Sequence, residues 1–120
     1  MANIFLDTNF VFDLIARDKK KITILSGHDI YISPLSLYIY YYSENIKVPH
    51  KLTVKLLKRF GFISLSKSLL KKAMEGPTSD LEDNIQLHSA LKAGCNYFLT
   101  SDKKLLKMRI FGKTKIVSKI

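Results

Sequence analysis

The chain has 120 residues, 47% of them apolar, and its 20 Lys and Arg against 10 Asp and Glu give a net charge of +10. This size and apolar content predict one ordered domain over residues 1–120, and no apolar run approaches the roughly 20 residues needed to cross a bilayer. The positive excess favours an anionic partner, nucleic acid first, with a merely soluble basic surface as the plainer alternative.

A single cysteine, Cys95, excludes an internal disulfide and a cysteine-rich zinc site, so a small buried side chain is expected there. The first residues lead into an apolar stretch without a basic region, so no signal peptide is expected. No long amphipathic helix with a separate basic face is found, which disfavours a membrane surface. These features predict a protein of the reducing cytoplasm.

Apolar runs and turn residues alternate along the first half of the chain. Ser33 followed by Pro34 predicts a helix start, and Gly27 and Gly61 predict the ends of two helical segments. The expected elements are a strand at 2–6, a helix from 8, an apolar segment at 19–26, a strand at 30–32, and helices from 34 and from 49 to Gly61.

The second half continues the alternation. It predicts a strand at 62–65, a helix capped by Ser66, a helix from 80 to 94, a strand at 96–100, a short helix at 102–107 and a strand at 115–117. The helix from 80 is expected to bury Leu81, Ile85, Leu87, His88 and Leu91. Strands that alternate with helices predict an α/β fold with a mainly parallel sheet, covered on both faces by right-handed crossovers.

Two aspartates stand directly after predicted strands: Asp7 after the first and Asp102 after the fourth. In an open parallel sheet, the carboxyl ends of the strands meet at one edge, where ligands bind. Each aspartate has an alternative role as a helix N-cap. Thr8 or Asn9 could take that role from Asp7, and Ser101 could take it from Asp102.

Further acids lie in the first turn of the helix that begins near residue 80, where the helix dipole favours them. Asp80 is expected to cap this helix and Glu82 to point to a different side, so Asp83 is the candidate that joins Asp7 and Asp102. Carboxylates brought together repel one another unless a cation lies between them, and hard oxygen ligands suit Mg²⁺ or Mn²⁺. The pattern predicts a metal-dependent site for a polyanionic substrate.

Two parts of the sequence resemble the PIN-domain family. Phe5–Asp13 is similar to the opening of such a domain, and Asp80–Gln86, Ala90–Leu91 and Ala93–Leu105 are similar to its C-terminal half. The resemblance implies a three-layer α/β/α sandwich, a five-stranded sheet in the order 3-2-1-4-5, and Mg²⁺- or Mn²⁺-dependent cleavage of RNA. Many small members are VapC-type toxins of toxin–antitoxin pairs, so it also implies an antitoxin partner and a homodimer.

By position, the resemblance assigns metal binding and catalysis to Asp7, Asp83 and Asp102, with Thr100 supporting Asp102 and Asn9 shaping the site near Asp7. The implied reaction is hydrolysis in which the cation polarises the phosphate and activates a water, leaving a 5′-phosphate and a 3′-hydroxyl. The RNA backbone would be held by the basic residues after Asp102, whose alternative is a solvated face: Lys103, Lys104, Lys107 and Arg109.

One position departs from the family pattern. Family members usually carry a glutamate on the helix after the second strand, and here that position falls on or near Ile39. Glu44 lies five residues further, about 500° around the helix, and so faces elsewhere. This departure leaves open a catalytically degenerate PIN-like module that binds RNA or a protein without cleavage.

Two other residue types are candidate ligand contacts. His28, His50 and His88 lack metal-ligand spacing, and His88 is expected to be packed. The tyrosines at 38, 40, 41 and 42 could stack unpaired bases, although a core or interface role is commoner for such a run.

Overall fold

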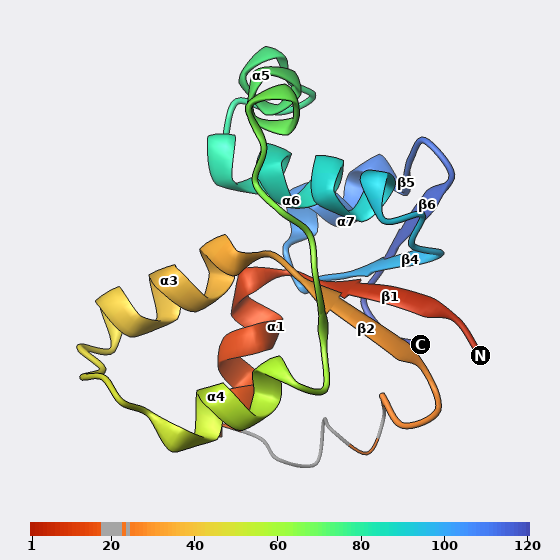
Figure 1. The fold of residues 1–120 in the computed structure, drawn as a ribbon. Helices are drawn as coiled ribbons and strands as arrows, with labels where there is room; N and C mark the ends of the chain where they lie inside the picture. Colours follow the sequence, from red (N-terminus) through yellow and green to blue (C-terminus); the bar gives the residue numbers. More distant parts are fainter. Residues whose placement is uncertain (18–22, 24) are drawn as a thin grey trace.

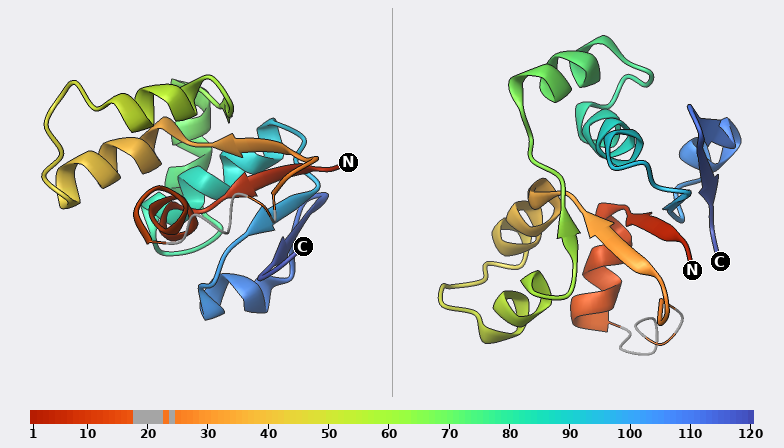
Figure 2. Two further views of the ribbon diagram at one scale, coloured as in Figure 1. Left: turned by 90° about the horizontal axis from the view of Figure 1, so that it is seen from below. Right: turned by 45° about the vertical axis from the view of Figure 1, so that its right-hand side comes forward.

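A computed structural model describes residues 1–17, 23 and 25–120. Its strands are β1 (Asn3–Leu6), β2 (Asp29–Ile32), β3 (Gly61–Phe62), β4 (Tyr97–Leu99), β5 (Ile110–Phe111) and β6 (Thr114–Val117). They form one six-stranded sheet in the order β3-β2-β1-β4-β6-β5 (Figure 1). The pairs from β3 to β6 are parallel, and β5 pairs antiparallel with β6. Figure 2 shows the short β3 beside β2 at one end of the sheet.

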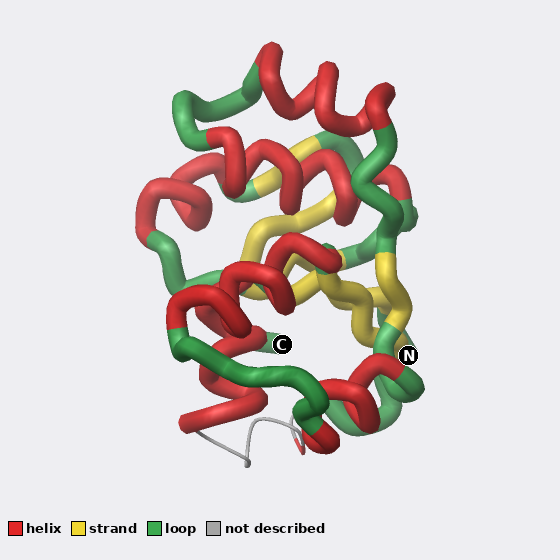
Figure 3. The backbone as a smooth tube through the Cα atoms, turned by 60° about the vertical axis from the view of Figure 1, so that its left-hand side comes forward, coloured by secondary structure: helices red, strands yellow, loops and turns green. Residues whose placement is uncertain are grey.

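Helices cover both faces of this sheet (Figures 1 and 3). One face carries α1 (Thr8–Phe12) with the π-helical turn η1 (Asp13–Arg17), α3 (Pro34–Ser43) and α4 (Lys51–Leu57). The other carries α6 (Leu81–Lys92) and α7 (Lys103–Met108), and α5 (Lys67–Glu75) packs on α6. The predicted α/β class, the three layers and the parallel strand order are therefore confirmed, with one strand more than expected.

The sheet divides the apolar core in two. Leu6 and Ile32 belong to a first cluster with α1, while Phe5 and Phe98 belong to a second cluster with Leu87 of α6. Successive side chains of a strand point to opposite faces, so one short strand supplies both clusters. The predicted burial of Cys95 is also confirmed, and burial raises the pKa of its thiol to about 12. None of the described helices is both long and apolar enough to span a bilayer.

Three helix starts follow the predicted capping chemistry. The Ser33 hydroxyl accepts from the Leu35 N–H at 3.1 Å, and the Ser66 hydroxyl accepts from Leu69 at 3.2 Å. Asp80 accepts from the Asp83 N–H at 3.0 Å, so Asp80 caps α6. Each bond satisfies a backbone donor that the first helical turn leaves without a partner.

The structure differs from the prediction around Gly61. The helix expected from residue 49 covers only Lys51–Leu57, and Gly61 lies in β3 opposite Tyr31. A Cβ atom at Gly61 would stand 2.6 Å from the Tyr31 ring, so glycine is required there by close packing. Of the strand expected at 62–65, only Phe62 is paired in the sheet, as part of β3. The segment expected at 19–26 lies largely outside the described residues, and Gly27 has the positive φ of +84° expected at a helix end.

The last part of the chain contains a strand that the sequence pattern missed. The α7 helix ends at Arg109, whose φ is +65°, and the chain then folds into a hairpin between β5 and β6. Gly112, with φ of +60°, forms its turn. A strand of only two residues is too short to show an alternating pattern, which explains the omission.

The buried face of α6 is more polar than predicted. Leu81 and Leu91 are 47% and 37% exposed, whereas Asn84, Gln86 and Ser89 are buried. The reason is that α6 is covered on two sides, by the sheet and by α5. The Asn84 side chain donates to the Ala73 carbonyl of α5 at 2.8 Å, so a polar residue is satisfied within this contact.

Candidate active site at the carboxyl edge of the sheet

The parallel register of β1 and β4 brings the two strand-end aspartates to one edge. Leu6 pairs with Leu99, and the Asp7 N–H donates to the Leu99 carbonyl at 3.1 Å. Asp102 follows β4 after a two-residue connection. Adjacent parallel strands end about 4.8 Å apart, so residues just beyond their ends are neighbours regardless of their separation in sequence.

Asp7 is both a helix cap and a buried carboxylate. Its Oδ1 accepts from the N–H groups of Asn9 and Phe10 at 2.7 and 3.2 Å, and its Oδ2 accepts a short hydrogen bond from the Thr100 hydroxyl. The side chain is 6% exposed. Burial raises the pKa of Asp7 above its usual value, the hydrogen bonds lower it, and repulsion from Asp102 raises it further. The alternative in which Thr8 or Asn9 caps the helix is wrong.

Asp102 caps α7 in the same way, and Ser101 does not. Its Oδ1 accepts from the Lys104 N–H at 2.8 Å. Its own N–H donates at 3.0 Å to the hydroxyl of Thr100, the residue that also donates to Asp7. Thr100 is fully buried, and its one hydroxyl group links the Asp7 carboxylate to the backbone of Asp102.

Asp83 comes to the same edge from the first turn of α6. Its pKa is raised from 3.8 to about 6, first by burial and then by the charges of Asp80, Asp102, Glu82 and Asp7. Four carboxylates therefore act on Asp83 electrostatically. The three aspartates singled out in the sequence do converge, although they come from three separate segments.

The raised pKa of Asp83 predicts how the stability of the metal-free protein depends on pH. A carboxyl whose pKa is higher in the folded chain binds more protons when folded, so its contribution to the unfolding free energy falls as pH rises. The loss begins near the unfolded pKa of 3.8 and is complete above about pH 6. Asp83→Asn should therefore gain stability relative to the wild type across this interval and remain more stable at neutral pH.

Urea unfolding in the presence of a chelator, at several pH values from 4 to 8, measures this difference. The exposed Asp29→Asn variant is the matched control for the loss of one carboxylate away from the edge. A difference between wild type and Asp83→Asn that stays constant with pH would show that the carboxyl does not titrate in this interval.

Sequence reasoning misplaced Glu82, which lies at the same edge. The Gln86 side chain donates from Nε2 to Glu82 Oε2 at 3.3 Å, and its Oε1 accepts from the Thr8 N–H at 2.8 Å. Burial raises the pKa of Glu82, a hydrogen bond from the Thr8 side chain lowers it, and repulsion from Asp80 and Asp7 raises it. Gln86 lies four residues after Glu82 and therefore on the same helix face. This spacing is the sequence signal that could have placed Glu82 on the side of α6 that faces the edge.

Helix α3 touches this network through Ser36. The Ser36 hydroxyl lies 2.9 Å from the hydroxyl of Thr8, and both side chains are buried. Ile39 packs against the first core cluster, and Glu44 is exposed at the C-terminal end of α3. Helix α3 thus contributes the Ser36 hydroxyl group to this edge. Glu44 does not take the place of the glutamate that the family pattern puts near position 39.

The remaining predicted residues lie around the edge. Asn9 is exposed and contacts Asp7 through its backbone N–H. The basic candidates are all exposed, on α7 or directly after it: Lys103, Lys104, Lys107 and Arg109. His28 Nδ1 accepts from the Ala2 N–H at 3.1 Å, and His50 Nδ1 lies 3.0 Å from the Thr53 hydroxyl. His88 is half-buried with its Nε2 2.9 Å from the Gly76 carbonyl, which agrees with the expected packed role.

The donor set at this edge consists of carboxylate and hydroxyl oxygens. Among residues 1–17, 23 and 25–120, no three His, Cys, Asp or Glu side chains stand close enough to hold a metal ion directly. Mg²⁺ keeps several waters and commonly takes only one or two protein carboxylates. Mutually repelling carboxylates with raised pKa values are the expected state of such a site without its cation, so the residues fit a hard cation held largely through water.

One comparison with known proteins bears on the fold. No family model and no curated protein matches this sequence. The structure is similar to a chain of VapBC2 from Rickettsia felis, which was solved bound to a DNA fragment from its promoter. The TM-score is 0.67 at 16% sequence identity, and the match covers 96% of this chain and 97% of the other. The chain therefore has a PIN-like fold, which it shares with that chain of VapBC2.

Proposed function

We propose that this chain is a Mg²⁺- or Mn²⁺-dependent endoribonuclease. The supporting observation is the concentration of acid in a basic protein. Five of the ten Asp and Glu residues interact at the carboxyl edge or at the start of α6, although the net charge of the chain is +10: Asp7, Asp80, Glu82, Asp83 and Asp102. A cation at the carboxylates and a basic surface around them suit a polyanionic substrate.

In this proposal Asp7, Asp83 and Asp102 hold the cation largely through its bound waters. When bound, the cation supplies positive charge to the scissile phosphate and makes a water more acidic. Thr100 orients Asp7 and Asp102 together, and the backbone donors at the starts of α1 and α7 fix both side chains. The exposed ammonium groups of α7 hold the RNA backbone beside this edge.

The direct test is cleavage of single-stranded RNA by the purified protein with Mn²⁺ or Mg²⁺ and with a chelator. Cleavage that requires the cation, and products with 5′-phosphate ends, would support the proposal. Well-folded protein that neither binds the cation nor cleaves RNA would contradict it.

The position of Glu82 leads to a prediction about cation affinity. Glu82→Gln should weaken Mn²⁺ binding about tenfold, because it removes a negative charge that acts on both Asp83 and Asp7. Glutamine can keep the contact to Gln86 through its carbonyl oxygen, so the fold is expected to remain. Isothermal titration with Mn²⁺ measures the change, and Glu75→Gln, at an exposed glutamate of α5, is the matched control. Equal loss of affinity in both variants would mean that only total charge matters.

A catalytically degenerate PIN-like module is the second candidate. The observation in its favour is that the α3 position expected to carry an acid is Ile39, which packs against the first core cluster. Such a module would bind RNA or a protein partner through its basic surface. It would show RNA binding that is unaffected by Mn²⁺ and by Asp7→Asn.

The likeness to VapBC2 also supports partner proposals. We propose that the chain is the toxin of a toxin–antitoxin pair in the cytoplasm, that an antitoxin protein binds it, and that it forms a homodimer. Co-expression with the product of a neighbouring gene, followed by size-exclusion chromatography with light scattering, tests the antitoxin and the dimer separately.

A further inference from the structure

Two tyrosines stand outward on α3 with their rings together. Tyr38 is 67% exposed and Tyr42 is 80% exposed, and their ring centroids are 6.4 Å apart with an angle of 21° between the planes. They are four residues apart, which places both on the same face of the helix. Two exposed, nearly parallel aromatic rings form a small aromatic surface, and exposed apolar surface of this kind is where ligands and partners bind.

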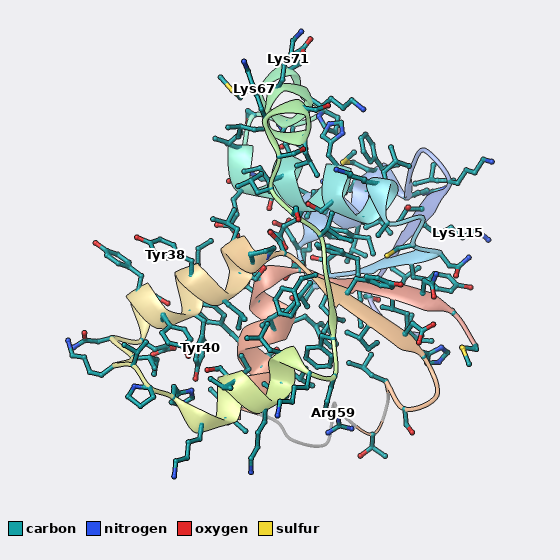
Figure 4. All side chains as sticks on the ribbon, viewed as in Figure 1. Tyr38, Tyr40, Arg59, Lys67, Lys71 and Lys115 are labelled. Atoms are coloured by element: carbon teal, nitrogen blue, oxygen red, sulfur yellow. The ribbon has the colours of Figure 1, made fainter. Side chains whose placement is uncertain are left out.

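The other two tyrosines of the run, Tyr40 and Tyr41, have structural contacts with the rest of the protein. Tyr40 is 5% exposed and packs edge-to-face on Phe12, and the Tyr41 hydroxyl is hydrogen-bonded to the Thr53 hydroxyl of α4. In Figure 4, Tyr40 points from α3 toward α4, whereas Tyr38 projects from the other side of α3. The core needs the inward tyrosines, and it does not account for the outward pair.

The outward pair begins close to the acidic edge. The first turn of α3 reaches that edge, because Ser36 contacts Thr8, the neighbour of Asp7. At about 1.5 Å and 100° per residue, Tyr38 and Tyr42 lie roughly 3 and 9 Å further along the helix axis than Ser36, and about 200° and 240° around it. They therefore stand on the exposed side of α3, while Ser36 faces the buried contact with Thr8. An extended strand of RNA that passes the acidic edge can therefore continue along α3.

The charge of the segment that follows these tyrosines indicates which partner could cover them, RNA or a second copy of the chain. Between Tyr42 and Met74 the sequence has one acid, Glu44, and eight cations: Lys47, Lys51, Lys55, Lys58, Arg59, Lys67, Lys71 and Lys72. Lys67 and Lys71 project outward from α5 (Figure 4). A second copy of the chain would bring like charges together, whereas the phosphates of RNA complement them.

We propose that Tyr38 and Tyr42 form a platform on which unpaired RNA bases stack, so that the substrate is held as a single strand beside the acidic edge. This inference rests on the proposed ribonuclease function for its biological meaning, but the platform itself binds without a metal. Stacking uses the π-face that every base has, so it selects unpaired over paired RNA and discriminates little among sequences.

The test measures RNA binding in the presence of a chelator, so that neither cation binding nor cleavage contributes. The probe is a short single-stranded RNA that contains 2-aminopurine, whose fluorescence is quenched on stacking, compared with a hairpin duplex of similar length. The variants are the double substitution of Tyr38 and Tyr42 by alanine, the same double substitution by phenylalanine, and Leu52→Ala, which removes an exposed apolar side chain of α4 as a control.

We expect the double alanine variant to bind single-stranded RNA about tenfold or more weakly and to lose the quenching. The phenylalanine variant should retain both, because it keeps the rings, and the Leu52→Ala variant should bind as the wild type does. Binding to the duplex should change little in any variant. Since both tyrosines are exposed, thermal melting of the variants should match the wild type.

Two results would overturn the platform. One is equal affinity of the wild type and the double alanine variant for single-stranded RNA. The other is dissociation of a dimer by the alanine substitutions with no change in RNA affinity, which would show that the tyrosines join two copies. These results are separate from the ribonuclease test: tyrosine-dependent binding without any cleavage would sustain the platform and reject the nuclease, and cleavage without tyrosine dependence would do the reverse.

Discussion

Replacing Asp7 by asparagine should lower metal-dependent RNA cleavage by about a hundredfold or more, and Asp102→Asn should do the same, while both variants remain folded. Either change removes one carboxylate from the set that we propose to hold the cation. The fold should survive because the asparagine oxygen can still accept from the backbone N–H groups that each aspartate caps.

The measurement is the initial rate of cleavage at saturating Mn²⁺, with Mn²⁺ affinity determined on the same samples. Circular dichroism and thermal melting confirm that each variant is folded. The matched control is Asp29→Asn, an exposed aspartate at the start of β2, at the opposite end of that strand from the acidic edge. If Asp7→Asn and Asp102→Asn cleave at the wild-type rate, the assigned site is wrong.

Phe98→Ala should have the largest effect on stability, lowering the unfolding free energy by about 3–5 kcal/mol. Phe98 is fully buried and stacks on Phe5, its register partner across β1 and β4, with 5.6 Å between ring centroids. Small domains have only about 5–15 kcal/mol of stability in total. The loss is therefore large enough to leave a substantial fraction unfolded.

Urea unfolding of Phe98→Ala, Phe98→Leu and Ile110→Ala gives the comparison. Phe98→Leu should lower the unfolding free energy less than Phe98→Ala because it leaves a smaller cavity. Ile110→Ala should lower it least, since Ile110 is 51% exposed. An equal effect at positions 98 and 110 would show that the β1–β4 contact does not dominate the second core cluster. Because the same two strands carry Asp7 and Asp102, Phe98→Leu should also weaken cation binding if the pairing shifts.

The alternation of strands and helices was predictable because it depends on local patterns. The apolar run before Asp7, the Ser33–Pro34 helix start and the Asp80 cap each follow from residues close in sequence. The fifth parallel strand was also found. By contrast, the short β5 hairpin and the role of Gly61 depend on contacts between distant segments, such as the Tyr31 ring that covers Gly61.

The candidate site was only partly predictable for the same reason. Asp7, Asp83 and Asp102 could be chosen because strand ends and helix starts meet at one edge. Glu82 was misassigned because its orientation depends on Gln86, and Gln86 is buried against Thr8 from a segment 78 residues away. The division of the tyrosine run into an inward and an outward pair likewise required the position of α4 relative to α3.

The gathering of five acids at the carboxyl edge and the start of α6 also gives the molecule an uneven charge distribution. The chain has 20 basic and 10 acidic residues. When ionised, the five acids of this region carry −5 charges, and the rest of the chain, with 20 basic and the other 5 acidic residues, carries 20 − 5 = +15. In the field of a polyanion, the free protein would turn its basic flanks forward and its acidic edge away. Under the proposed function, a divalent cation bound at the edge would reduce this opposition and would bias which way the protein faces RNA, and added salt would weaken that orientation.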